Sequence, residues 1–134
     1  MQPVGISRLH PLLRAALIVI SGLAGAAASA HHSFAMYDRE HPVTIAGEVR
    51  EFQWTNPHVW IQVLVPKPGG GMEEWSVECT SVNYLTRWGW TRHTLTPGDK
   101  VALKVYPLKD GSKGGSLAEL TSINGRAPNL VRQE

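Results

Sequence analysis

The feature that most constrains the fold is a series of short segments in which apolar and polar residues alternate. A period of two places the apolar side chains on one face of a β-strand. Proline and glycine separate the segments, as in the runs Pro66–Gly71 and Lys109–Gly115. The alternating segments begin near Val43, Val59, Glu73, Val101 and Leu117. The sequence therefore predicts an all-β protein with five short strands.

One short helix is expected between the third and fourth strands, with Ser81 as its N-cap and Gly89 at its end. This order of elements is typical of a small Greek-key barrel of the oligonucleotide/oligosaccharide-binding (OB) type. In the first strand the apolar phase shifts after Val49, to Phe52 and Trp54, and with Gly47 nearby this predicts a bulge or sharp bend. An open sandwich with one covering helix is the alternative.

A single apolar core is expected beneath these strands. Twelve residues should converge there: Val43, Ile45, Val49, Val59, Ile61, Val63, Trp75, Val77, Val101, Leu103, Val105 and Leu120. The only cysteine, Cys79, shares the alternation of Trp75 and Val77, so we expect a buried thiol. One cysteine excludes an internal disulfide.

The first 30 residues have the parts of a secretory signal peptide. Arg8 and Arg14 precede an apolar stretch over 15–28, and Ala28-Ser29-Ala30 fits the small-residue cleavage pattern. The apolar stretch is shorter than the roughly 20 residues that span a bilayer. We therefore expect cleavage after Ala30, a periplasmic or secreted product, and no stable membrane anchor.

Cleavage would leave an N-terminal arm (31–42), a barrel domain (43–124) and a C-terminal tail (125–134). Loss of the two signal-peptide arginines leaves 11 basic and 11 acidic residues in the mature chain. A neutral chain lacks the excess of Lys and Arg that phosphate backbones require. We therefore do not expect nucleic acid as a partner. The expected partner is an unknown periplasmic protein or a small ligand.

A copper site is the main chemical hypothesis. Cleavage after Ala30 makes His31 the N-terminal residue, and a free amine beside imidazole nitrogens suits Cu(II). Either His32 or His58, which follows the Asn56-Pro57 turn, would supply a further nitrogen. Cleavage before Ser29 would instead place His31 third from the amine, which also favours Cu(II). The alternative is that the terminal histidines bind nothing and that the His58 ring hydrogen-bonds a backbone carbonyl and stabilises its turn.

Three tryptophans, Trp54, Trp60 and Trp90, are candidates for an exposed aromatic surface that stacks on a ligand. The alternative is that these large side chains fill the core. Glu78 is a candidate ligand or base, or an ordinary solvated strand carboxylate. His41 and His93 are expected in solvated loops.

Several motifs resemble a family of small exported bacterial proteins of uncharacterised function. They are His32-Ser33-Phe34-Ala35-Met36-Tyr37-Asp38, Glu51-Phe52-Gln53-Trp54-Thr55-Asn56-Pro57-His58, Gly89-Trp90-Thr91-Arg92, Pro97-Gly98-Asp99-Lys100-Val101 and Lys109-Asp110-Gly111-Ser112. The resemblance covers the mature chain and implies a secreted, single-domain β-barrel, without an assigned activity or ligand.

These observations favour an exported β-barrel that binds Cu(II) through its processed N-terminal histidine. The alternative is a metal-free ligand-binding or protein-interaction module that uses the tryptophan surface. No enzyme is indicated, because the sequence has no nucleophile-plus-base motif, phosphate-binding glycine loop or cysteine cluster for zinc.

Overall fold

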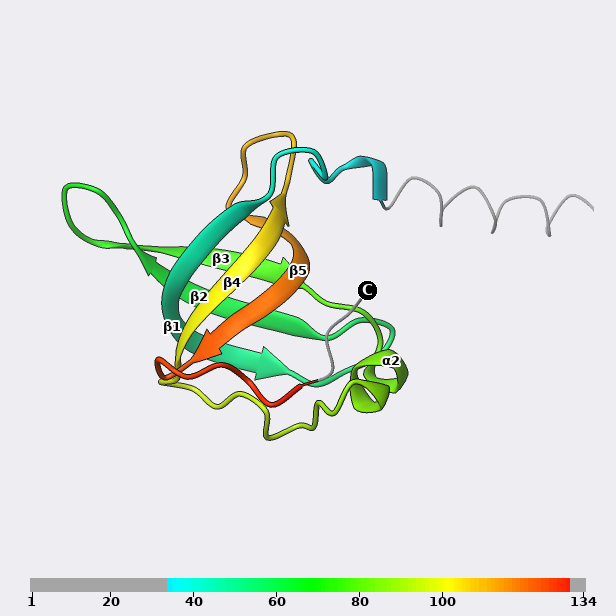
Figure 1. Cartoon of the computed structure of the whole chain (residues 1–134). Helices are drawn as coiled ribbons and strands as arrows, with labels where there is room; N and C mark the ends of the chain where they lie inside the picture. Colours follow the sequence, from blue (N-terminus) through cyan, green and yellow to red (C-terminus); the bar gives the residue numbers. More distant parts are fainter. Residues whose placement is uncertain (1–33, 131–134) are drawn as a thin grey trace, which may run out of the picture. The chain divides into compact units, whose positions relative to one another are not determined.

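The computed structural model describes residues 34–130, and their strands close into a barrel in the order β1-β2-β3-β5-β4 (Figure 1). All neighbouring strands are antiparallel except β3 and β5, which are parallel. The elements are β1 (Val43–Gln53), β2 (Trp60–Pro66), β3 (Met72–Glu78), α2 (Val82–Arg87), β4 (Lys100–Pro107) and β5 (Gly114–Ile123). The predicted five-stranded OB-type barrel, with its helix between the third and fourth strands, is confirmed.

The helix α2 begins after Ser81, as predicted, but the Ser81 side chain makes no capping hydrogen bond. Its end is defined by Gly89, which has a φ of 84°, and by the Trp90 amide, which donates to the Leu85 carbonyl over 3.0 Å. Figure 1 shows α2 at one side of the barrel, opposite the long β2–β3 hairpin. The residues between β3 and β4 thus cover one end of the barrel.

Eleven of the twelve predicted core residues are buried in one cluster. Val43 is the exception, because it lies at the start of β1 and is only partly buried against that cluster. Sequence alternation did not identify three core residues that lie outside the strands, Leu85, Trp90 and Leu95. Cys79 is buried as predicted, and burial followed by the charge of Glu78 raises the pKa of its thiol.

The predicted bend in the first strand is present, and the two halves of β1 pair with different strands. Its first half pairs with β4 from Val43 to Glu48, and its second half pairs with β2 from Glu48 to Gln53. The register with β2 shifts between Val49 and Glu51, as expected for a bulge. This change of partner along one strand is what allows the barrel to close.

Part of the N-terminal arm is held against the barrel. Tyr37 forms an antiparallel bridge with Leu108, the Asp38 amide donates to the Pro107 carbonyl over 2.8 Å, and the Lys109 amide donates to the Met36 carbonyl over 2.9 Å. Tyr37 is buried, whereas Met36 is 48% exposed. Tyr37, not Met36, is therefore the side chain that fixes this segment.

The signal-peptide prediction, His31 and His32 lie outside the described residues. Within 34–130, no helix has the length and apolar character needed to cross a membrane.

Candidate functional site

A row of four side chains runs across the outer face of the barrel. Strand register aligns Trp60 of β2 with Glu78 of β3, Glu78 with Ser116 of β5, and Ser116 with Tyr106 of β4. All four are partly exposed, and their chain neighbours Ile61, Val77 and Val105 face the core. This outer row places one carboxylate between two aromatic side chains.

Two described residues of the arm, Tyr37 and Arg39, contact this outer row. The Tyr37 hydroxyl donates a hydrogen bond to Glu78 Oε2, and the guanidinium of Arg39 lies 5.2 Å from the centroid of the Tyr106 ring. Together with the backbone bonds at Asp38 and Lys109, these contacts fix residues 36–39. Residues 36–39 therefore form part of the outer surface around Glu78.

His58 approaches the same carboxylate from the β1–β2 loop. The loop is joined to the end of β3, because the Val59 amide donates to the Thr80 carbonyl and the Cys79 amide donates to the Val59 carbonyl. The Thr55 hydroxyl also donates to the His58 carbonyl over 3.2 Å. In this position His58 Nδ1 contacts Glu78 Oε1. Its side chain is 41% exposed, against 15% for Glu78.

This contact determines which nitrogen of the neutral His58 ring carries the proton. A carboxylate accepts hydrogen bonds, so the neutral ring carries its proton on Nδ1 and its lone pair on Nε2. A histidine that binds a metal usually donates its other ring N–H to a carboxylate or carbonyl in this way. The geometry of His58 and Glu78 thus suits a metal at Nε2.

The Tyr37 phenol is kept neutral by its surroundings. Burial contributes most to raising its pKa, and the hydrogen bond to Glu78 and the charge of that carboxylate act in the same direction. Because the folded state disfavours the phenolate, Tyr37 contributes stability that is complete below about pH 10 and declines as the pH rises further.

We therefore expect the free energy of unfolding to fall above pH 10, and to fall less steeply in Tyr37→Phe. Urea unfolding at several pH values between 8 and 11 would measure this. Tyr84→Phe is the matched control, because Tyr84 is 53% exposed and should leave the pH dependence unchanged. Equal slopes for wild type and Tyr37→Phe would contradict the assignment.

The three tryptophans do not form one exposed surface. The prediction is wrong for Trp90, which is only 3% exposed because it packs beneath Phe52 in the core, with ring centroids 6.2 Å apart. Trp54 is partly buried against the core cluster, and its ring centroid lies 5.6 Å from that of Phe52. Trp60 alone belongs to the outer row.

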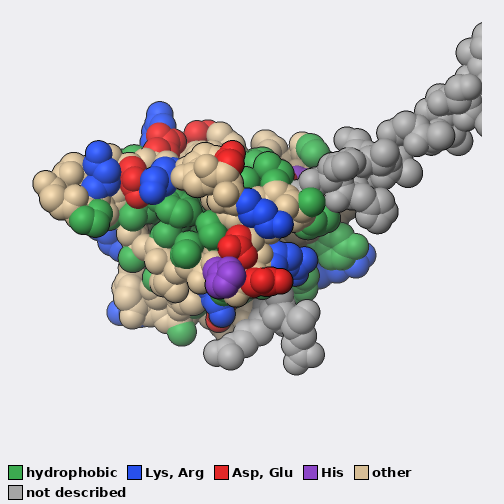
Figure 2. Space-filling view, turned by 90° about the horizontal axis from the view of Figure 1, so that it is seen from above, with side chains coloured by type: hydrophobic (Ala, Val, Ile, Leu, Met, Phe, Trp, Pro, Cys, Tyr) green, Lys and Arg blue, Asp and Glu red, His purple; other side chains and the backbone are tan. Residues whose placement is uncertain are grey.

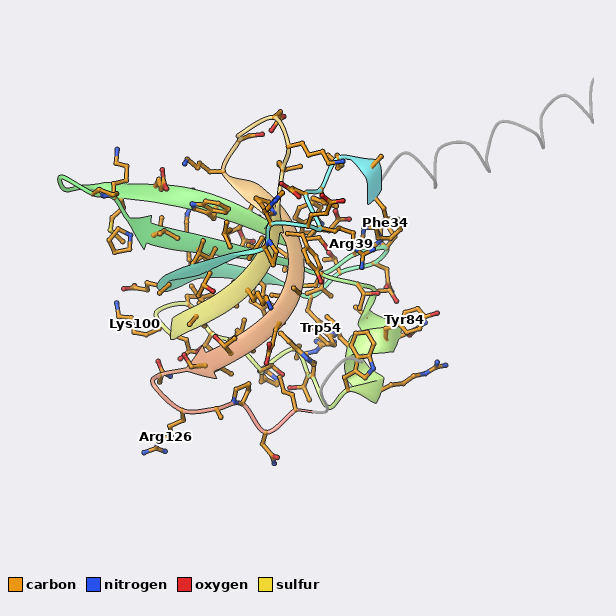
Figure 3. The ribbon with its side chains drawn as sticks, turned by 45° about the horizontal axis from the view of Figure 1, so that its top comes forward. Phe34, Arg39, Trp54, Tyr84, Lys100 and Arg126 are labelled. Carbon is orange, nitrogen blue, oxygen red and sulfur yellow. The ribbon has the colours of Figure 1, made fainter. Side chains whose placement is uncertain are left out.

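An aromatic pair that sequence analysis missed lies at the C-terminal end of α2, where Tyr84 is 53% exposed and Trp88 is partly buried against the core. The ring centroids of Tyr84 and Trp88 are 6.0 Å apart, and the Arg87 guanidinium lies 5.7 Å from the Tyr84 ring. Figure 3 shows Tyr84 pointing away from the barrel, with Trp54 nearer the strands. The spacing of four residues between Tyr84 and Trp88 could have indicated this pair, because residues four apart are neighbours on a helix surface.

The remaining candidate ligands do not join His58. His41 is exposed and contacts Asp38 three residues earlier, with 3.0 Å between Nδ1 and Oδ2, and His93 lies in an exposed turn. Among residues 34–130, no group of three or more His, Cys, Asp or Glu side chains is arranged to hold a metal ion. A metal at His58 therefore needs ligands from outside this part of the chain.

The face seen in Figure 2 carries acidic and basic side chains interspersed with hydrophobic ones. Among residues 34–130, Arg50 pairs with Glu74 and Lys100 pairs with Glu48.

The strand order and the position of α2 define a small OB-type β-barrel. The chain belongs to a family of unknown function (DUF6152), which it matches over residues 18–118. No curated protein matches the sequence. Among solved structures, it is similar to the mitochondrial single-stranded DNA binding protein Rim1 from S. cerevisiae, with 13% identity and a TM-score of 0.44. That match covers 70% of this chain and 96% of the other.

Proposed function

We propose that this protein is an exported β-barrel that binds Cu(II) through its processed N-terminal histidine, with His58 as a further ligand. The observation that carries the proposal is the contact between His58 Nδ1 and Glu78, which leaves the lone pair of the partly exposed ring on Nε2. Three nitrogen donors would be the amine and ring of His31 and Nε2 of His58. Nitrogen donors of this kind suit Cu(II) in a tetragonal site.

The position of Tyr37 supports the proposal. His31 precedes Tyr37 by six residues, and a chain advances at most about 3.6 Å per residue, so this segment spans up to about 20 Å. Tyr37 and His58 contact the two oxygens of one carboxylate. The segment from His31 to Tyr37 is therefore long enough for His31 to reach the His58 ring.

The mature protein, with its first residue verified as His31 by mass spectrometry, is expected to bind one Cu(II) per chain at neutral pH. Removing the ring in His58→Ala should weaken binding by about 100-fold, because loss of an outer-shell partner alone costs 10- to 100-fold. Competition with a chelator of known affinity would measure this. His93→Ala, which removes an exposed imidazole elsewhere, is the matched control and should bind like wild type.

A second candidate is a metal-free interaction module, favoured by the exposed side chain of Tyr84 on α2, which lies beside the partly buried Trp88. Absence of Cu(II) binding by the mature protein would reject the copper proposal and leave this alternative. Tight binding that His58→Ala does not change would reject His58 as a ligand.

A further inference from the structure

Two segments of the described chain cover the end of the barrel that carries α2. They are residues 80–98, between β3 and β4, and residues 124–130, which follow β5, and together we call them the α2 end (Figure 1). The second segment returns toward the first, because a Cβ atom at Gly89 would lie 3.8 Å from Leu130 Cδ2. The α2 end is therefore one continuous surface.

This surface differs in charge from the rest of the described chain. It carries three arginines, Arg87, Arg92 and Arg126, and no Asp or Glu, whereas the rest of residues 34–130 has seven basic and ten acidic side chains. All three arginines are exposed, and none pairs with a carboxylate of the described residues. Asp99, directly after the first segment, accepts hydrogen bonds within the fold. The α2 end is thus a basic surface without compensating charges.

The same end exposes an aromatic side chain beside its basic charge. Tyr84 is 53% exposed, the Arg87 guanidinium lies 5.7 Å from its ring centroid, and the Trp88 ring centroid lies 6.0 Å away. Tyrosine and tryptophan have an apolar ring with a polar tip, and arginine has an apolar stem with a charged head. Side chains of this kind suit the boundary between water and lipid.

We propose that the α2 end docks the protein on the surface of a membrane that contains anionic lipids. The arginines contact lipid phosphates, the Tyr84 ring enters the headgroup region, and the barrel stays outside the bilayer. The proposal goes beyond the copper function and is independent of it, because it uses neither His58 nor the N-terminal histidines.

The spacing of the charges favours a membrane over a small acidic ligand. Figure 3 shows the labelled Tyr84 and Arg126 at opposite sides of the α2 end, and both point away from the barrel. Arg87 is three residues from Tyr84 on the helix, so the basic charge extends from one side of this end to the other. An extended anionic surface can contact all three arginines at once, whereas a small ligand cannot.

The expected attachment is weak and depends on salt. A basic residue near an anionic membrane surface raises the affinity about fivefold, so three arginines together contribute about 100-fold. Raising the ionic strength from about 0.1 M to 1 M shortens the Debye length from about 10 Å to about 3 Å. High salt should therefore release most of the bound protein.

Sedimentation with lipid vesicles supplies the first test. The chain that begins at His31 is suitable, because the barrel and its core cluster lie within residues 34–130. With a chelator present to exclude metal, it should bind vesicles of equal parts phosphatidylcholine and phosphatidylglycerol. It should bind vesicles of phosphatidylcholine alone at least tenfold more weakly.

A pair of triple variants separates the α2 end from net charge. Replacing all three arginines of the α2 end by Gln should weaken binding to the anionic vesicles about 100-fold, and each single replacement about fivefold. The matched control removes the same net charge from exposed lysines elsewhere: Lys67→Gln, Lys104→Gln and Lys109→Gln. It should bind within about threefold of wild type. Because all six side chains are exposed, both triple variants should unfold in urea like wild type.

The orientation on the vesicle is the second test. A fluorophore sensitive to polarity can be attached at Asn83→Cys on α2, or at Pro68→Cys in the β2–β3 hairpin on the opposite side of the barrel (Figure 1). The native Cys79 is buried and should not react in the folded protein. Anionic vesicles should increase the fluorescence of the label on α2 and leave that of the hairpin label unchanged.

Three results would overturn the proposal. Equal losses in the two triple variants would show that net charge, and not the α2 end, drives binding. A response of the hairpin label instead of the α2 label would show that another face meets the lipid. Failure to bind anionic vesicles would reject membrane docking, and arginine-dependent binding of a single-stranded oligonucleotide or of polyglutamate in its place would assign the α2 end to a nucleic acid or to an acidic protein.

Discussion

Blocking the N-terminal amine of the mature protein is expected to weaken Cu(II) binding by about 100-fold or more, because it removes a ligand and not merely an outer-shell partner. A glutamine placed before His31 achieves this chemically, since it cyclises to pyroglutamate and leaves no free amine. Every side chain of the mature protein is retained, including His31, His32 and His58. The change therefore tests the amine by itself.

Competition titration at neutral pH would measure the loss, after mass spectrometry has verified the first residue of both proteins. His32→Ala is the companion variant. It should leave binding unchanged if the ligands are the amine, His31 and His58, and should weaken it if the amine, one amide and the His32 ring form the chelate. Affinity should also fall as the pH drops through about 6.5, because protonated imidazole cannot bind the metal.

Binding that survives the pyroglutamate block would show that the amine is not a ligand, and the site would have to be built from side chains alone. Within the part of the chain that the structure describes, no three such side chains lie together. The block thus decides between a site that depends on signal-peptide cleavage and one that does not.

Much of the barrel was predictable because apolar and polar residues alternate regularly along its strands. Every second residue of β2 and β4 faces a single core, so Ile61, Val63, Leu103 and Val105 are recognised by spacing alone. Trp90 and Leu95 were missed for the opposite reason. They lie in the irregular segment between α2 and β4, where no period indicates which side chains point inward.

The candidate site was predictable only in pieces. His58 and Glu78 each stood out as candidate ligands, one after a proline turn and one on the polar side of a strand. Their contact depends on the pairing of β2 with β3, and the contribution of Tyr37 depends on a bridge to Leu108, 71 residues further along the chain. Such contacts come from barrel closure, which local patterns do not encode.

At Gly47 the local alternation predicts a core-facing side chain, but the closed barrel leaves no room for one. The alternation of β1 assigns Gly47 to the core-facing side, with Ile45 and Val49, where an apolar side chain would be expected. In the barrel, the backbone of β2 occupies that space. A Cβ atom at Gly47 would lie 2.2 Å from the Leu64 carbonyl oxygen and 2.9 Å from Val63 Cγ1. The glycine is therefore required by the close approach of β2 to β1 at the bend.

Gly47→Ala is accordingly expected to lower the free energy of unfolding by about 3 kcal/mol, the upper part of the usual range for overpacking, because the obstructing atoms belong to backbone that must shift. Such a loss is a large fraction of the stability of a small domain. Urea unfolding would measure it. Ala46→Ser is the matched control, since it also adds one heavy atom, at the neighbouring exposed position, and should change stability by less than about 0.5 kcal/mol. Equal stability of the two variants would mean that β1 and β2 can separate at the bend without cost, and that closure of the barrel does not depend on this contact.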